Sequence, residues 1–409
     1  MVKKYLSTVI VLTLVITIFV GCVEEKIDEQ KDLDDFRTVI DMRGEEVLVP
    51  KNISRVIDIS DGFIASIMQS FDIEEKLIGL GSTNLQEIDS YTFEDISGGN
   101  YTYEEGMNPV TYLNPALLDL PAVAEYDVAV NLETIASLDP DVVFVRIGFC
   151  SMNTDEYGTD EDIQTSIYKI EALGIPVVVL YGPPVFSSPD ISLVSEEIEI
   201  IGDVFNMTED AKELNEYIES IIDLIVNRTQ NITEEDKSTV LLFGLSPEVR
   251  KAGTGAGDVL CTDTMESYFI EEIVNAKNAI NHTGGWQIYS AEQILKLNPD
   301  VIVLPTDWGY HPPRELYNSS YYSTLQELDA VKNRRVWALP WTPYNCAKRL
   351  EYPIEVMVIA KAAYPERFSD FKINEWVLDF YKTVYHVDNE TAVQLRTIQW
   401  LDWTVDENV

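Results

Sequence analysis

Apolar residues follow two patterns along this chain. Runs of four to seven mostly apolar residues are typical of strands buried in a parallel sheet, and apolar residues recurring every three or four positions are typical of amphipathic helices. The first pattern predicts strands at 55–59, 77–80, 176–180, 239–245, 301–304 and 336–339. The second predicts helices at 162–173, 262–275, 350–363 and 373–385. Alternation of the two elements predicts an α/β fold.

One stretch of sequence occurs twice, at residues 131–145 and 291–304. The matched positions are Glu133 with Glu292, Pro140 with Pro299, and Asp141 with Asp300. Each copy begins with helical spacing, is interrupted by Pro-Asp, and continues as an apolar run. A helix, a turn and a buried strand that occur twice predict two similar Rossmann-like lobes, each with a central β-sheet.

The segment between the repeats has apolar residues at helical spacing from 191 to 228. It predicts one long helix that links the lobes as a stiff strut, or two packed helices broken near Asn206. The expected organisation is an N-terminal lobe at 37–189, a linker helix at 190–230, and a C-terminal lobe with a helical tail at 231–409.

The first residues have the order of an export signal. Lys3 and Lys4 precede an uncharged apolar run at 6–20, which is short for a membrane span. Gly21-Cys22 after this run resembles the end of a prokaryotic lipoprotein signal, which implies cleavage after residue 21 and lipidation of Cys22. An uncleaved anchor helix is the alternative. Residues 22–36 are strongly acidic and are expected to form an extended tether.

Composition excludes several partners. The chain has 70 Asp and Glu against 29 Lys and Arg, a net charge of −41. Such a surface does not suit nucleic acid and is repelled by anionic headgroups, so membrane contact is expected through the lipid alone. A hydrophobic content of 46%, with 14 Phe, 21 Tyr and 7 Trp, is enough for a large folded core.

Asn-x-Ser/Thr sequons are more frequent than this composition supplies by chance. They begin at Asn52, Asn100, Asn206, Asn227, Asn231, Asn281, Asn318 and Asn389. Their number favours a surface glycoprotein of archaeal origin. The alternative is an Asn- and Thr-rich surface without glycans.

Catalytic and metal-binding motifs are absent from the sequence. Cys150, Cys261 and Cys346 lack C-x-x-C spacing, and either one disulfide or three buried thiols fits them. The glycine-rich stretch 253–257 follows a predicted strand and is expected to precede a helix, but it lacks the phosphate-loop pattern. It is interpreted as a close-approach loop at a cleft. No nucleophile motif occurs, so we expect no enzyme activity, no cofactor and no metal site.

Together these features resemble the substrate-binding proteins of ABC importers, in the helix-linked class that binds ferric siderophores, haem and cobalamin. Residues 38–50, followed by Arg55-Val-Ile, resemble the first hairpin and strand of that family, and Gly285-Trp286 also fits. The resemblance spans 37 to about 360. It implies a lipid-anchored protein on the outer face of the cytoplasmic membrane, which binds a metal chelate or corrinoid between its lobes and works with a permease dimer and its ATPase. It also implies that Glu133 and Glu292 dock on the permease, whereas a helix-capping role for each is the alternative.

Candidate cleft residues are aromatic or cationic side chains near the predicted strand ends. They are Tyr181, Trp286, Trp308, Tyr310, Trp341, Tyr344, Arg146, Arg250, Lys251 and Arg349. Aromatic residues suit a macrocycle or an aromatic siderophore, and the cations suit an anionic chelate. The alternatives are ordinary core aromatics and local salt bridges. A surface adhesin or sensor with the same fold, or a binder specific for cobalamin, is the alternative function, and the tail after Tyr364 has no expected role beyond packing.

Overall fold

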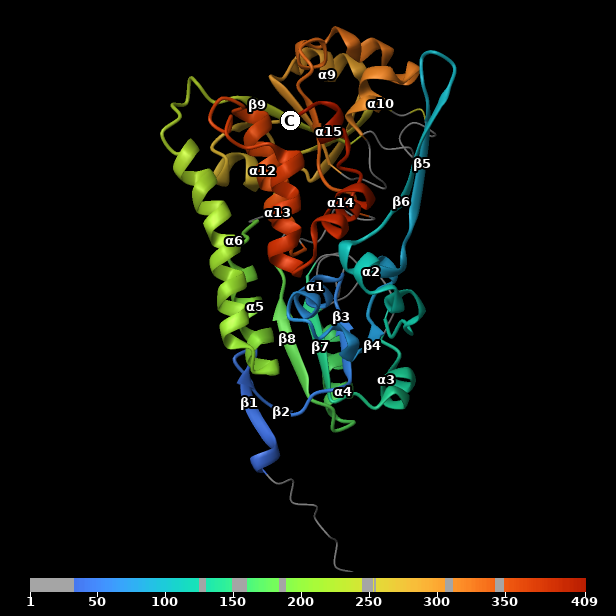
Figure 1. Ribbon diagram of the computed structural model, residues 1–409, viewed down its shortest axis with the longest axis vertical. Coiled ribbons are helices and arrows are strands. Elements are labelled where there is room, and N and C mark those ends of the chain that lie inside the picture. The colour runs from blue at the N-terminus through green and yellow to red at the C-terminus, as the bar shows by residue number, and fades with distance from the viewer. Residues whose placement is uncertain are drawn as a thin grey trace, which may run out of the picture.

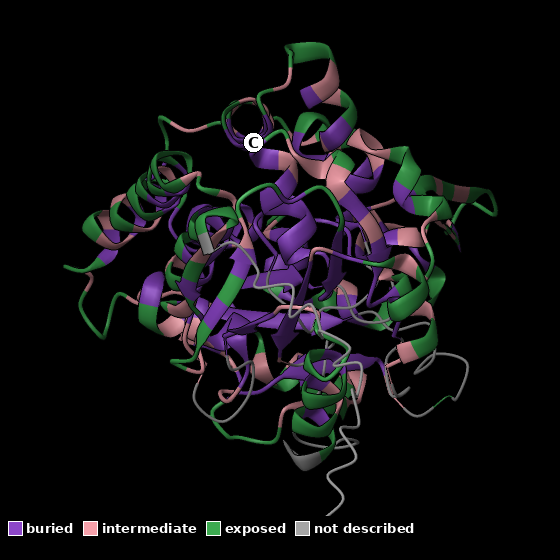
Figure 2. Cartoon of the chain, turned by 90° about the horizontal axis from the view of Figure 1, so that it is seen from below, coloured by how far each residue is buried: buried purple, intermediate pink, exposed green. Residues whose placement is uncertain are grey.

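The computed structural model describes residues 33–124, 130–148, 160–183, 189–244, 253, 255–305, 312–342 and 349–409. Two α/β lobes lie one above the other along the longest axis of the molecule (Figure 1). Both sheets are built mainly from fully buried residues, and the exposed residues lie on the helices and loops around them (Figure 2). The predicted α/β fold with two lobes is confirmed.

The N-terminal lobe contains a four-stranded parallel sheet in the order β4 (Leu77–Leu80), β3 (Val56–Ile59), β7 (Val142–Ile147) and β8 (Val177–Tyr181). Two antiparallel ribbons accompany it, β1 (Phe36–Ile40) with β2 (Glu46–Pro50) and β5 (Asp89–Glu94) with β6 (Asn100–Gly106). Its helices are α1 (Phe63–Ser70), α2 (Pro109–Leu113), α3 (Leu132–Leu138) and α4 (Asp160–Glu171). Short 3-10 turns lie at Leu33–Asp35, Glu74–Lys76, Thr83–Gln86 and Pro115–Asp119.

The C-terminal lobe has a mixed sheet in the order β12 (Trp286–Tyr289), β10 (Gly257–Leu260), β9 (Thr239–Gly244), β13 (Val301–Leu304) and β14 (Val336–Ala338). Strands β9, β13 and β14 are parallel, β10 and β12 are antiparallel, and β11 (Lys277–Asn278) also pairs with β9. Its helices are α8 (Met265–Tyr268), α9 (Ala291–Leu297), α10 (Pro313–Asn318), α11 (Asp329–Lys332) and α12 (Tyr352–Ala363). A π-helix at Phe269–Ile273 continues α8, and a 3-10 segment lies at Ser320–Glu327.

The linker consists of two helices, α5 (Leu193–Phe205) and α6 (Thr208–Thr229). Asn206 has a φ of 59° and ends α5, so the single continuous helix is wrong and the break near Asn206 is confirmed. The two helices pack side by side, since the Asn215 side chain donates to the Ser195 carbonyl (2.9 Å). The 22-residue helix α6 runs upward from the lower lobe to the upper lobe (Figure 1).

Both copies of the repeat form the predicted helix, turn and buried strand. Helix α3 ends at Asp139 and α9 at Asn298, and each end residue has a left-handed backbone. The carboxylate of the Pro-Asp pair then binds the start of the neighbouring strand. Oδ2 of Asp141 accepts from the backbone N–H groups of Ser54 (2.7 Å) and Arg55 (3.0 Å), and Oδ2 of Asp300 accepts from that of Thr239 (2.9 Å).

The glycine-rich stretch leads into strand β10 instead of the expected helix, which begins later, at Met265. A side chain on Gly257 would place its Cβ 2.3 Å from the carbonyl oxygen of Gly244, so glycine allows β10 to lie against β9. The tail forms α13 (Ile373–Tyr385), α14 (Asn389–Ile398) and α15 (Trp403–Asp406). In the described part of the chain, no helix combines the length and hydrophobicity that a membrane span requires.

Candidate docking and ligand-binding site

Glu133 and Glu292 occupy the same position in corresponding helices of the two lobes. Each is the second residue of its helix, α3 or α9, and each side chain is exposed. Figure 1 shows α3 low in the N-terminal lobe and α9 at the top of the C-terminal lobe. The two carboxylates are therefore well separated along the long axis of the molecule.

Other side chains cap these two helices. The Asn131 side chain accepts from the N–H of Thr134 (3.0 Å). Ser290 and Gln293 form a reciprocal capping box, with bonds of 3.3 and 2.9 Å. Hydrogen bonds from its own backbone N–H and from the Ser290 side chain lower the pKa of the Glu292 carboxyl. Glu292 is therefore an ionised surface group, and neither glutamate is the N-cap residue of its helix.

Arg146, a candidate ligand cation, lies at the end of β7 and is paired with one acid of its own lobe and one of linker helix α5. Its Nε donates to Glu197 (2.6 Å) and its Nη1 to Asp61 (3.1 Å). Its guanidinium also covers the ring of Phe63, 4.1 Å from the ring centre. All these groups are buried. Arg146 therefore forms local salt bridges, the alternative to ligand binding, and two carboxylates balance its charge.

A third buried acid lies close by on β3. The Asp58 carboxylate accepts from the N–H of Ala65 (3.0 Å), and burial raises its pKa to about 7. Burial also raises the pKa of Glu197 to about 7, against the opposing effect of Arg146. Sequence reasoning missed both acids. The signal was present, because Asp58 interrupts an apolar run and Glu197 stands on the apolar face of α5 beside Ile198.

Arg349 differs from Arg146 because part of its guanidinium has no partner. Its Nη2 donates to the Trp341 carbonyl (3.1 Å). Its Nη1 is buried and has no hydrogen-bond partner in the described part of the chain. A buried cationic donor without an acceptor is costly unless another group supplies one.

The aromatic candidates fall in different environments. Tyr181 ends β8 and Trp286 begins β12, and both are half-buried. Trp341 is fully buried beside Trp400 of the tail, with ring centres 6.4 Å apart, so the structure places it in the core and not on a cleft wall. The remaining predicted positions, Arg250, Lys251, Trp308, Tyr310 and Tyr344, lie outside the described residues, as do Cys22, Cys150 and Cys346.

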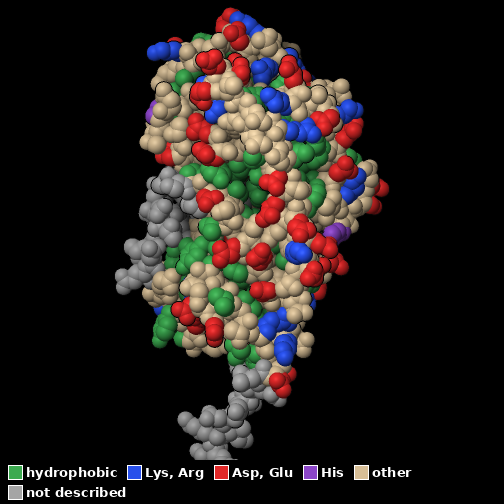
Figure 3. Space-filling model, turned by 90° about the vertical axis from the view of Figure 1, so that its left-hand side faces the viewer, with side chains coloured by type: hydrophobic (Ala, Val, Ile, Leu, Met, Phe, Trp, Pro, Cys, Tyr) green, Lys and Arg blue, Asp and Glu red, His purple; other side chains and the backbone are tan. Residues whose placement is uncertain are grey.

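The modification candidates in the described ranges are mostly at the surface. Asn318 is half-buried, and exposed side chains occur at Asn52, Asn100, Asn206, Asn227, Asn231, Asn281 and Asn389. Cys261 is a buried free thiol. Acidic side chains are spread over the face in Figure 3 and do not gather in one patch.

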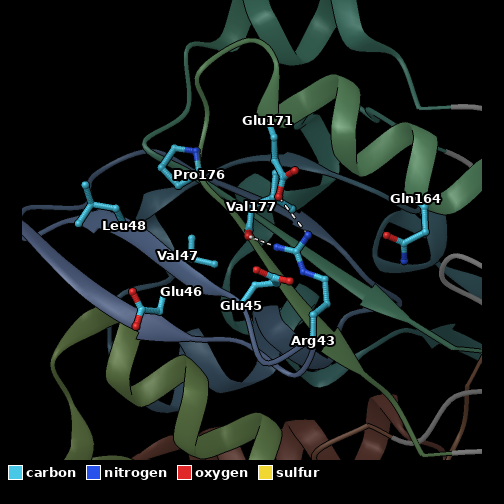
Figure 4. Close-up of a pocket in the computed structure, with 9 residues that line it drawn as sticks. All are labelled: Arg43, Glu45, Glu46, Val47, Leu48, Gln164, Glu171, Pro176 and Val177. Carbon is cyan, nitrogen blue, oxygen red and sulfur yellow. Dashed lines mark hydrogen bonds and ion pairs between the residues drawn. The ribbon is translucent and has the colours of Figure 1, made fainter.

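A pocket of about 420 Å³ lies in the N-terminal lobe and is lined by residues of β2, of helix α4 and by the first residue of β8 (Figure 4). Its central cation, Arg43, is held by Asp41 (2.8 Å), by Glu171 (3.0 Å) and by the Val177 carbonyl (3.2 Å). These bonds occupy the polar groups of Arg43. Among the residues that line the pocket, there is therefore no unpaired cation for an anionic ligand.

Two α/β lobes joined by a helical connection are the architecture of a two-lobe solute-binding protein. The family model described as "Periplasmic binding protein" matches residues 106–342, more than half of the chain, and the chain belongs to this family. The chain is therefore a non-enzymatic, extracytoplasmic substrate-binding protein of an ABC importer.

Individual relatives agree with this class. The chain is 24% identical over 377 residues to the molybdate-binding protein MolA of Haemophilus influenzae, covering 86% of this chain and 93% of the relative. It is 27% identical to the ABC transporter substrate-binding lipoprotein YvrC of Bacillus subtilis, over 60% and 68% of the two chains. The crystal structure of a periplasmic solute binding protein from Veillonella parvula superposes with a TM-score of 0.68 at 19% identity, over 91% of this chain and 100% of that chain.

Proposed function

We propose that this protein captures an anionic metal complex between its lobes, in the first place a ferric siderophore or a related haem or corrinoid. The observation that carries this proposal is the buried Nη1 of Arg349, which has no acceptor in the described chain. Arg146 is balanced by Asp61 and Glu197, so Arg349 is the described candidate cation with a remaining donor. An anionic oxygen of the ligand would complete its hydrogen bonds.

Titration of the purified protein, followed by tryptophan fluorescence, tests the ligand class. We expect a response to a ferric siderophore, haem or cobalamin, and a loss of affinity of at least tenfold in Arg349→Gln. Arg43→Gln is the control, since Arg43 is a half-buried arginine whose polar groups have local partners. Equal affinities of the Arg349→Gln variant and the wild type would remove Arg349 from the site.

An oxyanion is the second candidate ligand. The relative named for molybdate aligns with 86% of this chain, which supports including molybdate in the same titration. A response to molybdate without a response to the chelates would replace the first candidate. No fluorescence response to any of these ligands would favour the adhesin or sensor role.

We further propose that Glu133 and Glu292 dock on two related basic sites of a permease dimer. Their equal positions in α3 and α9 and their exposure support a symmetric contact. Replacing both by Ala should abolish uptake and leave ligand affinity unchanged. Glu209 and Glu390 are matched controls, because each is also the exposed second residue of a helix but lies outside the repeats. Full uptake by the double variant would contradict the docking assignment.

The proposed location is the outer face of an archaeal cytoplasmic membrane, with a lipid on Cys22 and glycans on the exposed sequons. The order of residues 1–22 and the exposure of the sequon asparagines support it. Mass spectrometry of the membrane fraction should find a lipid on Cys22. The Cys22→Ser variant should be released from the membrane. An unmodified protein that keeps residues 1–21 would contradict the lipoprotein assignment.

A further inference from the structure

The C-terminal tail lies between the two lobes. Figure 1 shows α13 and α14 below α12 and β9 of the upper lobe and above α1 and α2 of the lower lobe. Its residues Gln399 and Trp400, which follow α14, are almost fully buried. The tail is therefore positioned to contact both lobes at once.

The tail binds the N-terminal lobe at the end of β6. The indole N–H of Trp400 donates to the Glu104 carbonyl (2.9 Å), and its ring centre lies 5.6 Å from that of Tyr103. The Gln399 side chain donates to the Met107 carbonyl (2.7 Å), and the Met107 N–H donates to the carbonyl of Ile398 (3.3 Å). Three consecutive tail residues thus bind one short stretch of the N-terminal lobe.

The same stretch of tail also binds the C-terminal lobe. The backbone N–H of Trp341 donates to the Gln399 carbonyl (3.0 Å), and the Trp341 ring packs edge-on against the Trp400 ring. Trp400 has a φ of 52°, a left-handed backbone that is unfavourable for a bulky residue. Such a conformation persists where the surrounding contacts fix it.

A second crossing between the lobes comes from the β5–β6 hairpin. The Ile96 N–H, at its tip, donates to the carbonyl of Asn318 (2.7 Å), and the Tyr91 hydroxyl donates to Glu315 (2.7 Å). The guanidinium of Arg314 lies 3.3 Å from the ring centre of Tyr101. Figure 1 shows α6 on the left of the molecule, the hairpin on the right and the tail between them.

We propose that residues 398–400 are the fixing point of an interlobe brace that holds the two lobes in a fixed relative position. Two lobes joined only through a helical linker can rotate about it, whereas connections on three sides remove that freedom. The tail acts with the hairpin and α6 to make the lobes one rigid body. Ligand exchange then does not require the lobes to open. This inference does not depend on which ligand the protein binds.

Hydrogen exchange of the full-length protein tests the brace. The amides of Met107 and Ile96 donate across the lobe boundary, and those of Val143 and Val303 lie inside the two sheets. In the wild type we expect the Met107 and Ile96 amides to be protected like the sheet amides. In Trp400→Ala the Met107 amide should exchange at least tenfold faster, while Val143 and Val303 stay unchanged.

Trp403→Ala is the matched control. Trp403 is also a buried tail tryptophan, but its ring packs against Trp337 of the C-terminal lobe (5.5 Å between centres). It should leave Met107 protected. If Trp400→Ala does not fold, Gln399→Leu keeps the side-chain volume, removes the bond to Met107 and should also speed its exchange. Exchange of Met107 in the wild type at the rate of an exposed loop, or equal effects of the two tryptophan variants, would overturn the proposal.

Discussion

The two lobes share a repeated motif but differ in the chemistry at their strand ends. Asp58 of β3 corresponds to Leu242 of β9, since these residues pair with Phe144 and Val303 at matching positions of β7 and β13. Arg146 corresponds in the same way to Pro305. The N-terminal lobe therefore has buried charges where the C-terminal lobe has apolar residues.

This difference shows which part of the motif maintains the fold. The Pro-Asp turn is present in both lobes, because each Asp joins the start of one strand to the start of the next. The charged cluster occurs in one lobe, so a parallel sheet of this kind does not require it. It is stabilised by its own ion pairs, which compensate the desolvation of the buried groups.

The largest expected effect is on the pH dependence of stability. Because burial raises the pKa of Asp58 to about 7, the folded state favours its neutral form. The stability that neutral Asp58 contributes is fully present below the pKa that Asp58 has in the unfolded chain. It is lost as pH rises to about 7. At about 1.4 kcal/mol per pKa unit, Asp58→Asn should gain roughly 4 kcal/mol over the wild type between pH 4 and pH 8.

Urea unfolding followed by circular dichroism at both pH values measures this effect. Asp162→Asn, at an exposed position of α4, is the control and should keep the wild-type pH dependence. The same difference between pH 4 and pH 8 in Asp58→Asn and the wild type would show that folding does not raise the pKa of Asp58.

Removing the Pro-Asp carboxylates should have a smaller, unequal effect. Asp141 accepts three hydrogen bonds, two from Ser54 and one from Arg55, whereas Asp300 accepts two from Thr239. Because these bonds are exposed, Asp141→Ala should cost about 2 kcal/mol and Asp300→Ala about 1 kcal/mol of unfolding free energy. Urea unfolding at pH 7 provides the measurement, and a larger cost for Asp300→Ala would reverse the proposed order.

The smallest effect concerns the caps of the two docking helices. The double variant Ser290→Ala with Gln293→Ala removes both bonds of a capping box, and Asn131→Ala removes a single cap bond. We expect losses of about 1 kcal/mol and about 0.5 kcal/mol. Uptake should remain normal in both variants, since neither changes Glu133 or Glu292. Loss of uptake without loss of folding would assign the caps a role in docking.

Local patterns predicted much of this architecture. Helix α13 has the predicted bounds, and β4 and β13 lie where apolar runs placed them. These segments follow from periodicity, because burial of one face or of both leaves a regular pattern in the sequence. The break at Asn206 was left open, since apolar spacing continues through the turn between α5 and α6.

The candidate site was predictable only in part. The repeat identified Glu133 and Glu292, but the partners of Arg146 lie 85 and 51 residues away in sequence. Trp341 also follows a strand, as a cleft residue would, yet the tail covers it. No local pattern distinguishes a strand-end residue that faces a ligand from one that faces a distant segment.

The sequence by itself determined the two-lobe α/β class, the duplicated helix–turn–strand motif and the two equivalent glutamates, because each is recorded in neighbouring residues. Tertiary structure decided which charges are neutralised, which aromatics are core, and that residues 398–400 join the lobes. These outcomes depend on contacts between segments as many as 296 residues apart, as between Glu104 and Trp400. Periodicity carries no information about such contacts, since burial against any apolar partner produces the same pattern.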